Sequence, residues 1–120
     1  MTTTTLKKFL ALYLIPTDVM ADWAKTDPAI RKPAEEKMQA EWGRWMAQHS
    51  SMITLTQAAG KTKSITAAAG VGDIKNDIIL YSIVEAETHD AAARIFVNHP
   101  HLTIPQSSIQ VMEVRNMGPG

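Results

Sequence analysis

Two histidines stand two positions apart in the stretch "NHPHLTIP", residues 98–105. Pro100 favours an extended conformation for His99, so the imidazoles of His99 and His101 are expected to project to the same side. A His-x-His pair on extended backbone is a platform for a metal ion, which would need a third histidine or a carboxylate. The same pair could exchange protons, because histidine titrates near neutral pH, or could bond backbone groups in a turn. The motif leaves these three interpretations open.

A third imidazole, His49, falls at the end of a predicted helix and on its apolar stripe, together with Trp42, Trp45 and Met46. It is either a core histidine bonded to a carbonyl or a cation favoured by the helix C-terminus, where it could bind an anion. The tryptophans suit core and dimer packing as well as a binding site. If a pocket exists, Tyr13, Trp45 and Met46 are the residues expected to line its apolar wall.

Two glycine-containing stretches superficially resemble nucleotide motifs. The stretch "AAGKTKS", residues 58–64, lacks the first glycine of a phosphate-binding loop, since Leu55 occupies that position. The stretch "GVGDIKND", residues 70–77, lacks the third glycine of a dinucleotide fingerprint and precedes a strand rather than a helix. Lys61 and Lys63 are therefore interpreted as part of a solvated hairpin, and we assign neither a cofactor nor a metal to the chain.

Composition restricts the class of protein. The 120 residues predict one domain, residues 1–120, and the absence of cysteine excludes disulfides and thiolate metal sites. Twelve basic and twelve acidic residues balance without a basic cluster, which argues against nucleic acid as a partner. The apolar run at 9–15 is too short to span a membrane, and it is interpreted as a strand of a cytoplasmic protein that does not associate with membranes.

Apolar periodicity and turn residues predict the elements that position these side chains. Asp27 and Pro28 form a cap and first-turn pair, Pro33 suits the first turn of the main helix, and Thr88 caps a later helix. Gly43, inside the main helix, indicates a close approach of its backbone to the sheet. The expected strands are 9–15, 52–56, 63–67, 78–87 and 108–114, the expected helices are 18–25, 33–49 and 88–98, and the expected loop is 68–77.

The order of these elements reduces to β-α-β-β-α-β, which predicts an α+β, ferredoxin-like antiparallel sheet with two helices on one face. The strands at 9–15 and 78–84 are apolar on both sides, although such a sheet should present a polar face to water. A second copy packed sheet to sheet would cover that face, which predicts a homodimer of the dimeric α/β-barrel kind. The alternative is a monomer whose N-terminal segment covers the sheet.

Four stretches, "EWGRWMAQHSSMI", "GKTKSIT", "LYSIVEAETHDAAARIF" and "HPHLTIPQSSIQVMEV", resemble the YCII-related (DGPF-type) proteins. The resemblance runs from the first strand to Val114 and implies a ferredoxin-like dimeric α/β barrel. Most members are uncharacterised, and a few relatives are small-molecule enzymes, such as a dehydrochlorinase of aromatic degradation. The resemblance implies an acid/base pair of a His and an Asp. The His corresponds to His49, and His99-Pro100-His101 stands where the family has an Asp-Pro-Phe type of turn.

Two functions follow as expectations. The first is a small-molecule acid/base enzyme, isomerase-like or lyase-like, in which His49 and His99 exchange the proton and His101 orients a small organic ligand. The second is a non-catalytic ligand-binding or dimeric interaction protein in which the histidines are structural. An enzyme requires an exposed imidazole facing an apolar cleft, whereas a structural role would bury or pair all of them.

Overall fold

The computed structural model describes residues 5–117. The strands are β1 Lys7–Leu14, β2 Ile53–Ala58, β3 Thr62–Thr66, β4 Gly70–Ile74, β5 Ile78–Ala86 and β6 Ser108–Glu113. The helices are α1 Thr17–Ala24, α2 Pro28–Gln48 and α3 His89–Arg94, followed by the short 3₁₀ helix η1 Pro100–Thr103. The predicted strand at 78–87 and the last strand agree with β5 and β6 to within one residue.

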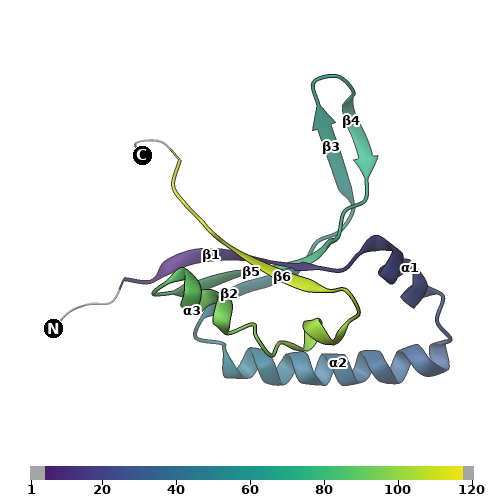
Figure 1. Cartoon of the computed structure of the whole chain (residues 1–120), viewed down its shortest axis with the longest axis horizontal. Coiled ribbons are helices and arrows are strands. Elements are labelled where there is room, and N and C mark those ends of the chain that lie inside the picture. Colours follow the sequence, from purple (N-terminus) through teal and green to yellow (C-terminus); the bar gives the residue numbers. More distant parts are fainter. Residues whose placement is uncertain (1–4, 118–120) are drawn as a thin grey trace.

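Four strands form an antiparallel sheet in the order β2-β5-β1-β6. The helix α2 runs beneath this sheet, and η1 lies between them (Figure 1). No helix among residues 5–117 covers the opposite face of the sheet (Figure 1). This α+β arrangement is compatible with the predicted ferredoxin-like fold.

Side chains alternate along β1 because successive residues of a strand point to opposite faces. Phe9, Ala11 and Tyr13 are buried on the face that packs against the helices, whereas Leu10 and Leu12 are half-buried on the other face. In β5 the buried positions are Ser82, Val84 and Ala86, and they alternate with Tyr81, Ile83 and Glu85. The core therefore lies between the sheet and α2, where Trp45 and Phe96 complete it.

The main helix begins five residues earlier than predicted. Asp27 is its N-cap, with a side chain that accepts a hydrogen bond from the Ala29 N–H at 2.9 Å, and Pro28 occupies the first helical position. Pro33 consequently lies inside α2 rather than in its first turn. It is exposed, so the carbonyl it leaves without an intrahelical partner is accessible to water.

The segment 68–77, predicted as a loop, contains β4. This strand pairs with β3 in a separate two-stranded sheet, and Gly70, with φ +68°, closes the turn between them. The strand predicted at 63–67 therefore belongs to a projecting hairpin and not to the main sheet (Figure 1). The hairpin carries the exposed ion pair between Lys63 and Asp73 at 2.7 Å. It differs from the solvated hairpin predicted around Gly60, because β2 pairs with β5 and Lys61 precedes β3.

Two further expectations are corrected. Gly43 is exposed, and a Cβ atom placed on it would meet nothing within 4 Å, so no close backbone approach explains this glycine. The helix predicted at 88–98 ends at Arg94, and the chain continues through turns into η1. Within residues 5–117, no helix combines the length and the apolar character that a bilayer crossing requires.

Candidate functional site

His99 and His101 lie in an aromatic cluster between β1, α2 and η1. The ring of His99 is 4.2 Å from that of Trp42 and 4.4 Å from that of Trp45, measured between centroids. Tyr13 lies 5.4 Å from His99 and 5.5 Å from His101. Both histidines are only 1% exposed. The structure thus brings the sequence-predicted residues Tyr13, Trp45, His99 and His101 together, but in the core rather than in an open cleft.

The backbone at this point explains the burial of both rings. His99 is extended, with φ −65° and ψ 138°, but Pro100–Thr103 is a 3₁₀ helix, so the expected extended His-x-His pair is not formed. The side chain of His99 is the N-cap of this short helix, because its Nδ1 accepts a hydrogen bond from the His101 N–H at 3.0 Å. This local hydrogen bond between a side chain and the backbone stabilises the turn at residues 98–101.

The cap determines the protonation state of His99. Since Nδ1 accepts a hydrogen bond, the proton of the neutral ring resides on Nε2. Nε2 is buried and has no hydrogen-bond partner within the described part of the chain. Burial, together with the smaller effects of the nearby His101 and His49, lowers the pKa of His99 to about 3. His99 is therefore a neutral donor at physiological pH.

His101 ties η1 to the end of β1. Its Nε2 lies 3.0 Å from the carbonyl oxygen of Leu14 and donates to it. Its own carbonyl accepts a hydrogen bond from the Ser107 hydroxyl at 2.8 Å. Burial lowers the pKa of His101, opposed by backbone hydrogen bonds to Leu14 and Ser108. A neutral, backbone-bonded ring of this kind stabilises the turn.

His49 is the C-cap of α2, as its position in the sequence predicts. Its ring lies 4.5 Å from that of Trp45 and is half-buried. His89, the remaining imidazole, lies 2.7 Å from the carbonyl oxygen of Val111 and stacks on Phe9. Across residues 5–117, no three His, Cys, Asp or Glu side chains are grouped so that they could bind a metal ion.

Three hydroxyl groups form a chain from the core toward the surface. The Tyr13 hydroxyl is 2.8 Å from the Ser82 hydroxyl, which is 2.7 Å from the hydroxyl of Thr56 on β2. Burial raises the pKa of Tyr13, although the hydrogen bond with Ser82 opposes this effect. Ser82, the polar interruption of an otherwise apolar strand, is the sequence signal for this row of hydroxyl groups. Its hydrogen-bond partners could not be predicted, because they depend on strand register.

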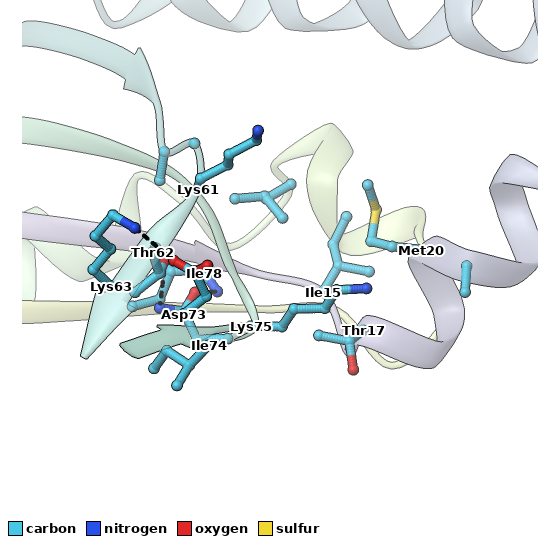
Figure 2. Close-up of a pocket in the computed structure, with 15 residues that line it drawn as sticks. Ile15, Thr17, Met20, Lys61, Thr62, Lys63, Asp73, Ile74, Lys75 and Ile78 are labelled. Carbon is cyan, nitrogen blue, oxygen red and sulfur yellow. Dashed lines mark hydrogen bonds and ion pairs between the residues drawn. The ribbon is translucent and has the colours of Figure 1, made fainter. Parts of the chain in front are cut away.

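A cavity of about 850 Å³ lies at the root of the hairpin, between β3, β4 and α1. Figure 2 shows Lys61, Lys63 and Lys75 around it, opposite Met20 of α1. Lys63 is paired with Asp73 and all three lysines are exposed. Flexible surface lysines do not make a preorganised anion site, so we assign no ligand to this cavity.

A larger cavity, of about 1030 Å³, lies between α1, α2, η1 and the sheet. Trp42 and Thr56 are the lining residues that connect it to the histidine cluster and to the hydroxyl chain. Tyr13, Trp45, Met46 and the histidines are not among its lining residues. Its apolar walls consist mainly of Ile15, Val19, Met20, Trp23, Met38, Trp42, Leu80, Ile104 and Pro105.

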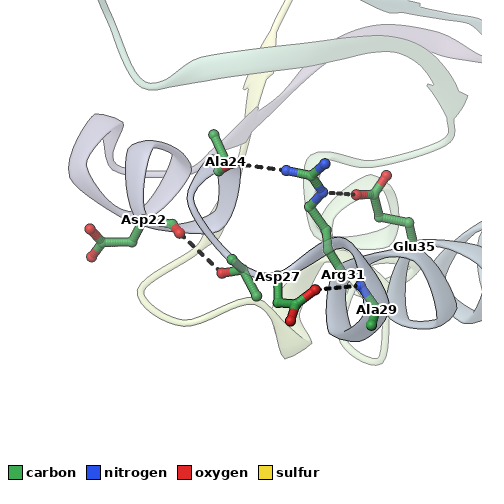
Figure 3. Close-up of polar contacts among 7 residues, drawn as sticks. Asp22, Ala24, Asp27, Ala29, Arg31 and Glu35 are labelled. Carbon is green, nitrogen blue, oxygen red and sulfur yellow. Dashed lines mark hydrogen bonds and ion pairs between the residues drawn. The ribbon is translucent and has the colours of Figure 1, made fainter.

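Polar contacts at the junction of α1 and α2 fix two walls of this larger cavity (Figure 3). Arg31 of α2 donates to the carbonyl oxygen of Ala24 at 2.9 Å and pairs with Glu35 at 3.2 Å. Thr26 donates from its hydroxyl to the Asp22 carbonyl oxygen at 3.0 Å. The junction holds the C-terminal end of α1 against the first turn of α2.

Comparison with known proteins identifies a similar fold. No family model matches the chain, and no curated protein matches it in sequence. A solved structure of 5-chloro-2-hydroxyhydroquinone dehydrochlorinase from Burkholderia phenoliruptrix AC1100, in complex with 2,5-dihydroxybenzoquinone, has a TM-score of 0.50. The two chains share 14% identity over 93% of this chain and 95% of that one. At this identity, the likeness shows a distant relationship in fold.

Proposed function

We propose that the protein binds a small planar organic molecule bearing a carbonyl or oxyanion oxygen in the cavity between α1, α2 and η1. The observation that carries the proposal is the Nε2–H of His99, a buried donor without a partner, packed against the wall residue Trp42. A buried unpaired donor costs about 1–3 kcal/mol. A ligand oxygen that reached Nε2–H after displacement of the Trp42 side chain would remove this cost.

The lining of the cavity fits such a ligand. Aromatic and aliphatic side chains form the walls, while Thr56 and Gln39 supply hydrogen-bonding groups. The structurally similar dehydrochlorinase acts on a hydroxylated aromatic ring and binds a quinone. This likeness, although distant, supports a planar ring with oxygen substituents as the ligand class and a place in the YCII-related family.

The proposed reaction is acid/base chemistry of the isomerase or lyase type at the carbon next to the ligand carbonyl. In this proposal His99 donates a hydrogen bond to the developing oxyanion and stays neutral, as its low pKa requires. In this proposal His49, half-buried beside Trp45, is the base that takes the proton from that carbon and releases it to solvent, while His101 keeps η1 and hence His99 in position. Trp45 packs against both His49 and His99 from α2, and Met46 packs against the adjoining core.

The test of binding uses two matched probes, 4-hydroxyacetophenone and 4-ethylphenol, which differ mainly in the carbonyl group. We expect the wild-type protein to bind the ketone about two- to twelvefold more tightly by NMR titration, which corresponds to one hydrogen bond of about 0.5–1.5 kcal/mol. In His99→Asn the amide oxygen can still cap η1, but the Nε2–H is removed and the amide N–H of the shorter side chain does not reach its position, so the preference should disappear. Binding of neither probe would refute the cavity assignment, and an unchanged preference in the variant would refute the role of His99.

The test of catalysis follows exchange of the methyl protons of 4-hydroxyacetophenone with deuterium. An acid/base enzyme should accelerate this exchange, and His49→Gln should abolish the acceleration because it removes the proton-exchanging ring. Binding without acceleration would instead support the second candidate function, a non-catalytic binding protein. That candidate is favoured by one observation: His99 and His101 are buried, and His101 and His89 bond backbone carbonyls.

We further propose that the protein is a cytoplasmic homodimer that joins its helix-free sheet faces, as in a dimeric α/β barrel. Leu10, Leu12 and Leu14 of β1 point to this face together with Tyr81 and Ile83 of β5. A row of apolar side chains on a face without helices supports a protein partner there. Sedimentation of the wild-type chain tests this proposal, since a monomer at micromolar concentration would refute it.

A further inference from the structure

The β3–β4 hairpin, which we call the arm (residues 62–74), extends away from the rest of the chain (Figure 1). Its strands pair with each other, and neither packs substantially against another helix or strand of the described chain. The radius of gyration, 17.1 Å, reflects this extension. A compact domain of this length would have a radius of about 13.6 Å.

One face of the arm is apolar near its turn. Ile65 lies directly opposite Val71 in the strand register, and the two side chains are 72% and 67% exposed. The paired Lys63 and Asp73 lie on the same face, two positions farther from the turn. Ser64 points to the other face, opposite Gly72. Water-exposed β-branched residues paired across strands are typical of a surface that packs against another layer.

Within residues 5–117, no other helix or strand forms such a layer over the arm. The cavity at its root separates it from α1, and in Figure 2 Lys63 of the arm and Met20 of α1 lie on its two sides. A two-stranded hairpin alone is at best marginally stable in water, and it gains stability when a third strand or another element covers its apolar face. A surface of a partner would supply this cover.

The position of the arm points to a second copy of this chain. The arm rises on the side of the sheet opposite α2, which is also the side of the helix-free face (Figure 1). A copy seated on that face would lie beside the arm. The charges agree with this arrangement, because Lys63 pairs with Asp73 on the arm and Lys8 lies opposite Glu85 on the sheet face, so neither surface carries a net charge.

The dimensions of the sheet face support the same conclusion. Four strands about 4.8 Å apart and about eight residues long give a face of roughly 500 Å² per protomer. A stable interface buries about 800 Å² per partner. Each protomer would bury one face of its own arm, which is about 17 Å long and about 10 Å wide and so has an area of about 170 Å². It would bury about the same area again where the arm of the other protomer packs against it. Sheet face and arms together then reach about 840 Å².

We propose that the arm packs its Ile65–Val71 face against a second copy of the chain seated on the helix-free sheet face, so that two arms clasp the dimer. This inference rests on the homodimer proposed above. The arm adds a contact that the sheet faces alone do not provide. In this inference β4, residues 70–74, supplies one strand of that contact.

The experiment compares two single substitutions that introduce the same charge on opposite faces of β3. Ile65→Asp should raise the dimer dissociation constant at least about tenfold by sedimentation velocity, because burial of an isoleucine changes an equilibrium constant by that factor or more. Ser64→Asp, on the face that points away from the partner, should leave the dissociation constant within about twofold of wild type. If the wild type is a stable dimer and both variants have the same dissociation constant as the wild type, the arm contact is refuted and the proposed sheet dimer is not.

A second measurement uses the unmodified chain. Amide hydrogen exchange of β3 and β4 is followed at concentrations above and below the dimer dissociation constant. Protection of the arm should be lost on dilution, since the arm is covered only in the dimer. Arm exchange that is independent of concentration would overturn the proposal, and a wild-type chain that remains monomeric would overturn both the arm and the dimer.

Discussion

The pH dependence of stability gives a direct test of the buried, neutral His99. Its pKa is about 3 in the folded protein, against an ordinary value of 6.5 in the unfolded chain. At pH 7.5 both states are neutral at this residue, so it contributes nothing to the pH dependence. As the pH falls below 6.5, the unfolded chain binds a proton that the folded protein does not bind. Stability is therefore lost progressively between pH 6.5 and pH 3.

The expected size follows from the separation of the two pKa values. At pH 5 the unfolded state is favoured by RT ln(1 + 10^1.5), which is about 2 kcal/mol. His99→Asn removes this titration but keeps a side-chain acceptor for the His101 N–H. The stability difference between wild type and variant should therefore shrink by about 2 kcal/mol between pH 7.5 and pH 5.

Urea unfolding, followed by tryptophan fluorescence at one fixed protein concentration, measures this difference. With a slope of about 2 kcal/mol per molar urea, the wild-type midpoint should fall by about 1 M more than that of the variant. The two proteins differ only at residue 99, so the comparison isolates the contribution of this side chain. Parallel pH dependences of the two midpoints would show that His99 is accessible to protons in the folded state, and would refute its burial as the basis of the proposed site.

Two further predictions concern polar groups that the fold positions. Ser82→Ala leaves the hydroxyls of Tyr13 and Thr56 without their buried partner and should cost about 1–3 kcal/mol in urea unfolding, whereas Tyr13→Phe combined with it should recover part of the loss. No recovery would mean that packing and not the hydroxyl chain sets the cost. Thr88→Ala removes the N-cap hydrogen bond to the Ala91 N–H and should cost about 1 kcal/mol in the same assay, with Thr88→Ser as the control that retains it. Equal midpoints for the two Thr88 variants would refute the cap.

Local signals in the sequence determined most of the strands and the caps of two helices. Alternating apolar residues marked β1 and β5, and Asp27 and Thr88 marked helix starts through short-range caps. The sequence did not predict β4, because glycines at 70 and 72 indicate a loop, while pairing of Val71 with Ile65 makes the segment a strand. Such pairing is a non-local contact that no single-segment pattern contains.

The candidate site also depends partly on local sequence and partly on tertiary structure. The sequence identified His99, His101 and His49 as the residues with chemical potential, because residue type and spacing are local properties. Whether an imidazole titrates depends on what surrounds it, and Tyr13, Trp42 and Trp45 come from segments about 50 to 90 positions away. The tertiary structure alone decided that His99 is a neutral buried donor beside a cavity, since desolvation is a property of the packed core and not of the chain.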